Sequence, residues 1–304
     1  MIRIDIQQII NQPLAVHLAF FLGRWIPLRI GYPLCNFVGD WAATRRDSKV
    51  TRAIRANQWV VRGANLRKEM LDRAVQETLK NNVRDLYLLY HYVQNPEATP
   101  RLIHLDGFAR QLIERREFAE RGLVIAGLHL SGFDLILQSI CRQGLKAMIL
   151  TIPNPQGGRL IEYEMRKKTG MNLVPASLGT LRQAVKHLEQ GGMVLTGMDH
   201  PVPDPKFHPR FFGCAAALPT HYISLALKAR VPVVIMAAIY QSDGKYHVQC
   251  SEPIEMECDS DREKEILRNT ENVLKLAEEF IRLAPQQWNI PLPVWPQWLG
   301  KVPD

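Results

Sequence analysis

Cysteine is scarce in this chain and lacks the spacing of a metal-binding or disulfide framework. The 304 residues include five cysteines, an odd number, and no two of them form a Cys-x-x-Cys pair. Zinc ribbons need such pairs, and small secreted folds need an even set of cysteines. The sequence therefore predicts free thiols in a reducing compartment.

Histidine and aspartate gather in one stretch, but their spacing matches no zinc pattern. The residues concerned are Asp199, His200, Asp204, His208 and His221. We therefore expect no metal ion, and no resident cofactor is indicated elsewhere in the chain.

Long hydrophobic runs are also missing. No stretch of about 18 uninterrupted apolar residues exists, so a membrane-spanning helix is not the first expectation. The apolar segment 13–41 is broken by Arg24 and Arg29 and is rich in aromatic residues, which favours helices lying in a membrane interface. A soluble helical hairpin that packs on the core is the alternative. A cleaved signal peptide is not expected, because only Arg3 precedes the segment and no small-x-small site follows.

Nucleotide and nucleic-acid motifs are missing as well. The chain has no G-x-G-x-x-G after a strand, no Walker loop, no zinc finger and no RNP motif. Its net charge of +8 and pI of about 9.3 nevertheless favour anionic partners. We expect an anionic membrane surface rather than nucleic acid, because basic residues directly follow the apolar segment. They are Arg45, Arg46, Lys49, Arg52, Arg55, Arg62, Arg67 and Lys68.

The remaining pattern is typical of an α/β protein. Residues 51–94 look helical, and from residue 101 onward short β-branched runs alternate with amphipathic helical stretches. Asp243-Gly244 between two apolar runs predicts a hairpin. The alternation predicts a mostly parallel central sheet covered by helices on both faces. We expect residues 1–44 to form a membrane-associating helical segment and residues 45–304 to form one domain.

The stretch His129-Leu-Ser-Gly-Phe-Asp134 carries the clearest chemical signal, because it lies where a buried strand turns into a helix. In open α/β sheets the carboxyl ends of the strands form the edge where ligands bind. A carboxylate there fixes the tautomer of an imidazole and leaves its other nitrogen free to take a proton from a hydroxyl. The alternative is a helix-capping box formed by Ser131 and Asp134, with His129 a loop residue.

The order of motifs resembles the bacterial lipid A late acyltransferases, a lauroyl and myristoyl transferase family within the lysophospholipid acyltransferase superfamily. The signature H-x4-D/E of that family matches His129 and Asp134. A Pro/Asn loop, Arg166 and a strand ending in Asp199 follow in order. The resemblance continues through Phe-Phe-Gly at 211–213 and Pro-Gln-Gln-Trp at 285–288, and it covers about residues 50 to 298.

The resemblance implies a catalytic pair. His129 would abstract the proton of the acceptor hydroxyl, and Asp134 would hold and charge-compensate the imidazole. Arg166 would bind a phosphate or the tetrahedral oxyanion through its planar fork of donors. Asp199 has a separate argument, because it ends a strand as His129 follows one, which allows both to face the same crevice. It would orient the acceptor or a basic side chain, or else cap the Pro-rich loop that follows it.

The resemblance also implies supporting residues and leaves the acceptor open. Arg210 or Lys206 would aid Arg166, and Phe212 and Gly213 would shape an acyl tunnel. His200 stands where the family usually has Gln, and Asp134 is Asp where the lipid A enzymes mostly have Glu. A lipid A precursor, a mannosylated phosphatidylinositol and a lysophospholipid all stay open as acceptors.

These observations predict a membrane-associated acyltransferase that moves a fatty acyl group from an acyl carrier protein or coenzyme A thioester to a lipid hydroxyl. We expect direct transfer without an acyl-enzyme, no cofactor beyond the thioester co-substrate, and a monomer. Its expected place is the cytoplasmic face of the cell inner membrane, peripheral or held by one N-terminal anchor. Two alternatives stay open: a serine hydrolase using Ser177, and an inert membrane-lipid-binding protein.

Overall fold

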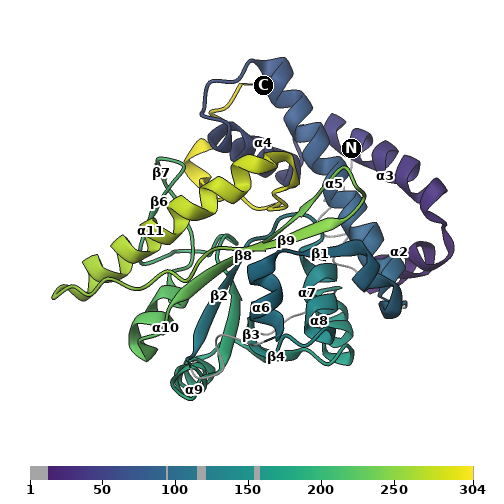
Figure 1. Cartoon of the computed structure of the whole chain (residues 1–304). Coiled ribbons are helices and arrows are strands. Elements are labelled where there is room, and N and C mark those ends of the chain that lie inside the picture. The colour runs from purple at the N-terminus through teal and green to yellow at the C-terminus, as the bar shows by residue number, and fades with distance from the viewer. Residues whose placement is uncertain (1–12, 94, 115–120, 154–157, 304) are drawn as a thin grey trace.

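The computed structural model describes residues 13–93, 95–114, 121–153 and 158–303. A seven-stranded sheet in the order β1-β9-β8-β2-β5-β3-β4 forms its centre (Figure 1). Every neighbouring pair is parallel except β8 and β9. The strands are β1 (Ile103–Leu105), β2 (Leu123–Gly127), β3 (Ala147–Thr151), β4 (Asn172–Pro175), β5 (Met193–Gly197), β8 (Val233–Tyr240) and β9 (Tyr246–Cys250).

Helices cover both faces of this sheet, as the alternation of sequence patterns predicted. The faces carry α6 (Gly107–Glu114), α7 (Phe133–Arg142) and α8 (Gly158–Lys168) on one side, and α9 (Leu178–Glu189), α10 (His221–Ala229) and α11 (Arg262–Leu283) on the other. In β2, Val124 and Ala126 join the core beneath α9 to α11, whereas Leu123 and Ile125 join the opposite core. Both faces of β2 are therefore buried, which explains its continuous apolar run.

The helical stretch predicted for residues 51–94 is two helices rather than one. They are α4 (Lys49–Val61) and α5 (Lys68–Tyr92). Gly63 and Ala64 both have positive φ, and this left-handed backbone ends α4. The predicted hairpin at Asp243-Gly244 is confirmed, because it joins the antiparallel strands β8 and β9.

Several predicted features lie partly outside the described residues. They are residues 1–12 of the N-terminal segment, residues 154–157 of the Pro/Asn loop, and the end of a helix that the sequence pattern predicts over residues 107–120. The smaller described elements are β6 (Arg210–Phe211) and β7 (Cys214–Ala215), which pair with each other, and the 3-10 turns η1 (Pro96–Leu102), η2 (Pro285–Gln287) and η3 (Pro296–Trp298).

The N-terminal helices α2 (Pro13–Trp25) and α3 (Leu28–Thr44) lie along the outer side of α5 (Figure 1). The inner face of α3 buries Gly31, Cys35 and Gly39. The opposite faces of the two helices expose a row of large apolar side chains. This apolar row is Leu18, Phe21, Leu22, Trp25, Ile30, Leu34, Phe37, Val38 and Trp41. Across the described ranges, no helix combines the length and apolarity that crossing a bilayer would require.

Candidate active site

The pairing of β2 with β5 brings His129 and Asp199 together. Gly127 and Gly197 are partners in the parallel register, and each of the two side chains follows its strand two residues later. Nδ1 of His129 lies 2.6 Å from Oδ1 of Asp199. The backbone N–H of His129 also donates to Oδ2 of the same carboxylate at 2.9 Å. Asp199 therefore fixes both the ring and the backbone of His129.

A segment near the end of the chain completes this arrangement. The indole N–H of Trp288 donates to Oδ2 of Asp199 at 2.8 Å, and both side chains are buried. The next residue, Asn289, donates its backbone N–H to the carbonyl of His129 at 2.8 Å. A buried carboxylate is tolerated when several donors satisfy it, and Asp199 has three.

The charges of the two groups support each other. Burial alone disfavours the imidazolium, but the charge and hydrogen bond of Asp199, together with the charge of Asp134, outweigh it and raise the pKa of His129 above 6.5. Burial likewise disfavours the Asp199 carboxylate, yet His129 and Trp288 hold its pKa below 3.8. Because Asp199 occupies Nδ1, neutral His129 carries its proton there and presents Nε2 as the basic nitrogen.

Asp134 is not the partner of the imidazole ring, contrary to the sequence prediction. Its Oδ2 accepts a hydrogen bond from Arg166 on α8 at 2.6 Å. Both side chains are partly exposed. Asp134 therefore positions a guanidinium next to His129, while the bond expected from it is made by Asp199.

The capping-box interpretation of this loop is wrong. Gly132, rather than Ser131, caps α7, with no side-chain hydrogen bond and with φ of 63°. Ser131 is instead buried. The positive φ suits glycine, which has no Cβ to clash.

Three ring and backbone contacts define the space around the imidazole. The rings of Phe133 and His200 have centroids 4.5 Å and 5.9 Å from that of His129. A Cβ added to Gly197 would lie 2.7 Å from Cε1 of His129. Glycine at the end of β5 therefore lets the ring lie against the strand.

The other predicted site residues contact α11. Arg210 and Phe212 donate their backbone N–H groups to Glu271 and Glu278. Phe212 and Gly213 form the positive-φ turn between β6 and β7. Lys206 pairs with Glu263.

It is Phe211, beside this turn, that reaches the site, because its ring contacts Trp288 edge to face with centroids 6.0 Å apart. The roles expected for Arg210, Phe212 and Gly213 at the substrate stay predictions.

Ser177 caps a helix. Its hydroxyl accepts from the backbone of Thr180 at 3.1 Å, and the Thr180 hydroxyl accepts from the backbone of Ser177 at 2.8 Å. This reciprocal capping box begins α9. The Ser177 hydroxyl is thus engaged in an exposed cap rather than paired with a histidine base.

The histidines considered for a metal site are separated by the fold. His221 is partly buried, its Nε2 lies 2.8 Å from the Thr196 hydroxyl, and desolvation lowers its pKa to about 4. In the part of the chain that the structure describes, no three His, Cys, Asp or Glu side chains are placed to hold a metal ion.

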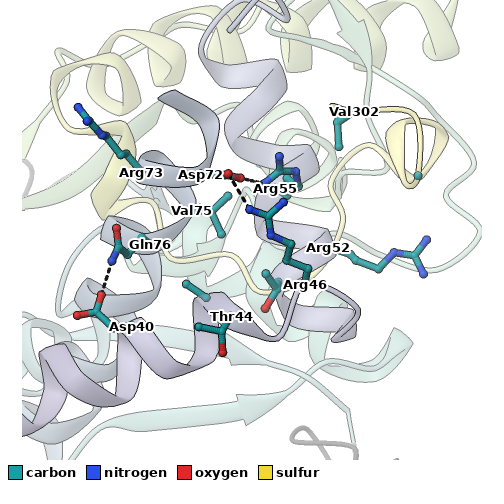
Figure 2. Close-up of a pocket in the computed structure, with 13 residues that line it drawn as sticks. Asp40, Thr44, Arg46, Arg52, Arg55, Asp72, Arg73, Val75, Gln76 and Val302 are labelled. Carbon is teal, nitrogen blue, oxygen red and sulfur yellow. Dashed lines mark hydrogen bonds and ion pairs between the residues drawn. The ribbon is translucent and has the colours of Figure 1, made fainter. Parts of the chain in front are cut away.

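A pocket of about 410 Å³ lies between α3, α4 and α5 and shares no lining residue with the His129 site (Figure 2). At its centre Asp72 accepts hydrogen bonds from Arg46 and Arg55, whereas Arg52 and Arg73 point outward to either side. Arg55 also donates to the carbonyl of Pro303 at 2.7 Å. Part of the predicted basic cluster is therefore used to fasten the C-terminal residues to α4.

Sequence reasoning missed the roles of Trp288 and Asn289. The resemblance places Trp288 in a matching block without a role, and it does not extend to Asn289 as a site residue. Their signal was a tryptophan followed by an amide residue directly after the long charged helix.

A comparison with known protein families shows the family of this chain. A sequence model of the bacterial lipid A biosynthesis acyltransferase family matches residues 8–296. A search of curated proteins returned no match. The match covers almost the whole chain, including His129, Asp134, Arg166, Asp199 and Trp288. The chain therefore belongs to the bacterial lipid A biosynthesis acyltransferase family.

Proposed function

We propose that this protein transfers a fatty acyl group from a carrier thioester to a lipid hydroxyl, with His129 as general base. The family implies an acyltransferase with a lipid acceptor and an acyl thioester donor. The observation that carries the proposal is the buried bond between Nδ1 of His129 and Asp199, because it leaves Nε2 as the basic nitrogen of a partly exposed ring.

The transfer proceeds in two stages, addition to the thioester carbonyl and loss of the thiolate. Nε2 of His129 takes the proton of the acceptor hydroxyl while the oxygen attacks the thioester carbonyl carbon, which forms the C–O bond and a tetrahedral oxyanion. The oxyanion then collapses, the C–S bond breaks, and the thiolate takes the proton from the imidazolium. Asp199 stabilises the imidazolium between these stages, as a carboxylate does behind a catalytic histidine.

Arg166 is placed to bind developing or resident negative charge. Its guanidinium lies close enough to His129 to lower the pKa of the ring, although the carboxylates outweigh it. The bond to Asp134 uses one guanidinium nitrogen, Nη2. We assign the other nitrogens, which bond no described residue, to a thioester oxyanion or a substrate phosphate. Asp134 is then a positioning residue for Arg166.

Arg210, Phe212 and Gly213 are proposed to support the site at the acyl chain. These residues lie on the turn beside Phe211, whose ring contacts Trp288. A role of this turn at the acyl chain would act through the contact between the rings of Phe211 and Trp288. No cofactor is proposed beyond the thioester co-substrate, which is acyl carrier protein or coenzyme A linked.

The apolar row on α2 and α3 supports binding to a membrane surface. Trp25 and Phe37 are 65% and 69% exposed, and soluble monomers rarely leave so contiguous an apolar surface in water. Each large side chain contributes roughly 1.5 to 3 kcal/mol when it leaves water. Arg24 and Arg45 lie over the rings of Trp25 and Trp41, at 5.2 Å and 4.8 Å, as expected for basic and aromatic groups at headgroup depth.

We therefore propose that residues 1–44 attach a monomeric acyltransferase domain, 45–304, to the cytoplasmic face of the inner membrane. Five further members of the basic cluster are exposed, and their positive charge favours anionic headgroups. They are Arg46, Lys49, Arg52, Arg67 and Lys68.

A panel of donors and acceptors tests the reaction. Purified protein is assayed with lauroyl and myristoyl thioesters of acyl carrier protein and of coenzyme A, and with a lipid A precursor, a mannosylated phosphatidylinositol and a lysophospholipid. We expect transfer by the wild type and loss of about 10² to 10⁴ in rate for His129→Ala with a native circular dichroism spectrum. Full activity of His129→Ala would reject the proposed base.

Incubation with radiolabelled donor alone separates direct transfer from the hydrolase alternative. We expect no acyl group on the denatured protein, and wild-type activity in Ser177→Ala. A stoichiometric label that disappears in Ser177→Ala would instead favour an acyl-enzyme. Mass spectrometry of lipids from a deletion strain would then identify the natural acceptor.

A further inference from the structure

A buried carboxyl lies behind the loop that carries His129 and Asp134. Asp85 is on α5 and is 8% exposed. The hydroxyl of Tyr246, the first residue of β9, donates to its Oδ1 at 3.4 Å. The backbone N–H of Gly132 and the side chain of Asn289 also face this carboxyl and favour its charged form.

These neighbours connect Asp85 to the loop at two points. Gly132 packs so closely on the ring of Tyr246 that an added Cβ would lie 2.7 Å from Cε1. Asn289, through its backbone N–H, bonds the carbonyl of His129. The loop is thus supported at His129 and at Gly132, two residues before Asp134.

A carboxyl at this buried position does not favour stability of the fold. Its Oδ2 is buried and accepts no hydrogen bond of normal geometry from the described residues, although Gly132 and Asn289 face the carboxyl. A buried carboxyl with an unsatisfied oxygen stabilises a fold less than an apolar side chain of similar size. Stability alone therefore does not account for it.

We propose that Asp85 is a positioning residue for acyl transfer, which fixes the turn at Gly132 and thereby the spacing between His129 and the Asp134–Arg166 pair. The inference rests on the proposed function of His129. Asp85 itself touches no reacting atom.

The ionisation of Asp85 bears on this role. Burial raises the pKa of its carboxyl to about 7, against the opposing effects of Gly132, Tyr246, Arg84 and Asn289. The loop amide, the tyrosine hydroxyl and the asparagine are all donors, and Arg84 on the same helix is positive. Protonation of Asp85 leaves these donors with one acceptor fewer. The turn at Gly132 is therefore held best when Asp85 is ionised.

Asp85→Asn and Tyr246→Phe test the proposal with the donor and acceptor pair that gives the highest turnover. Asp85→Asn replaces one acceptor oxygen by a donor and should lower kcat about 10- to 100-fold with KM within about threefold, because misplaced groups cost rate more than binding.

The pH profile gives a second readout. On its acid limb, where activity falls as the pH is lowered, log(kcat/KM) should have a slope near two in the wild type, because both His129 and Asp85 become protonated. The slope should be near one in Asp85→Asn. Tyr246→Phe removes a donor to the carboxylate and should move that limb to higher pH.

Thr78→Val is the matched control, because Thr78 is a buried polar residue of α5 whose hydroxyl, among the described residues, bonds within the helix to the carbonyl of Ala74. It should lower the melting temperature and leave kcat and the slope unchanged.

Wild-type kcat and slope in Asp85→Asn would overturn the proposal, and so would a loss of kcat without the change in slope. His129→Ala in the same assay separates the two hypotheses: if it stays active the general base is wrong, whereas an inactive His129→Ala with unchanged Asp85→Asn rejects only the positioning role.

Discussion

Nδ1 of His129 lies 2.6 Å from the carboxylate of Asp199, 70 residues further along the chain, although an aspartate stands only five residues away. The parallel pairing of β2 with β5 produces this contact. Asp134 turns instead to Arg166 on α8. The two carboxylates therefore have separate tasks, one behind the imidazole and one behind the guanidinium.

Asp199→Asn should lower kcat by about 10² to 10⁴, because the neutral amide no longer stabilises the imidazolium or fixes its tautomer. Asp199 raises the pKa of His129 against the effect of burial. Its removal should therefore move the acid limb of the residual activity to lower pH. Initial rates between pH 5 and 9 measure both effects.

Asp243→Asn is the control for this change, since Asp243 bonds His247 at 2.9 Å on the surface. It removes the same kind of bond without touching the site and should leave the profile unchanged. A normal rate in Asp199→Asn would contradict the role of the buried pair.

Arg166→Ala and Asp134→Ala should each lower kcat/KM about 10- to 100-fold, and the double variant should be little worse than either. The reason is that Asp134 acts by holding Arg166, so its effect vanishes once Arg166 is gone. A double-mutant cycle should give a coupling energy of about 1 to 3 kcal/mol. The exposed pair Arg121 and Glu255, 2.7 Å apart, is the control cycle, for which we expect at most about 1 kcal/mol in stability and no rate effect. Additive losses at Asp134 and Arg166 would show that they act independently.

Trp288→Phe should lower kcat about tenfold and destabilise the fold by about 1 to 3 kcal/mol, because it removes a donor to the buried Asp199 carboxylate. Trp295→Phe is a close match. Trp295 is also fully buried, and its indole nitrogen has no hydrogen-bond partner in the described part of the chain. It should lose stability from packing alone and keep its rate, as urea unfolding and initial rates would show. Equal rates in the two variants would argue against the indole bond.

Phe37→Asp should weaken binding to anionic vesicles at least tenfold while leaving the fold intact, because Phe37 is exposed in the middle of the apolar row. The phenyl ring of Phe37 stabilises binding when it enters the membrane interface. A charged carboxylate at the same place destabilises binding, because it must leave water. Flotation with phosphatidylglycerol vesicles at low and high salt measures the binding. Leu178→Asp changes an even more exposed apolar residue on α9 and should float like the wild type. If the two variants bind alike, the apolar row is not the membrane surface.

Asp85→Asn should make the protein more stable relative to the wild type as the pH rises. The pKa of Asp85 is about 7 in the folded protein and 3.8 in the unfolded chain. The stabilisation that its protonated form contributes is therefore complete below 3.8 and is lost as the pH rises to about 7. The difference in unfolding free energy between the variants should change by roughly 2 to 4 kcal/mol between pH 4 and pH 8. Denaturant unfolding across this range measures it, and a constant offset would contradict a raised pKa.

Much of the fold follows from local sequence patterns. Continuous β-branched runs predicted the buried parallel strands, and helical periodicity predicted α6 to α11 to within a few residues where they are described. The break between α4 and α5 was missed, because Ala64 adopts a positive φ that its residue type does not announce. The position of His129 directly after a strand was predicted as well, because the apolar run that marks this strand ends just before His129.

The sequence by itself determined the α/β class, the strand that ends at His129 and the apolar N-terminal segment, since each depends on the order of polar and apolar residues along a short stretch. Only the tertiary structure decided which carboxylate meets the imidazole. That choice depends on strand order: β5 pairs directly with β2, so Asp199 reaches Nδ1 of His129, while the first turn of α7 directs Asp134 toward α8. Trp288 and Asp85 join the same network from segments distant in sequence, because packing, which no local pattern encodes, brings η2 and α5 behind the loop.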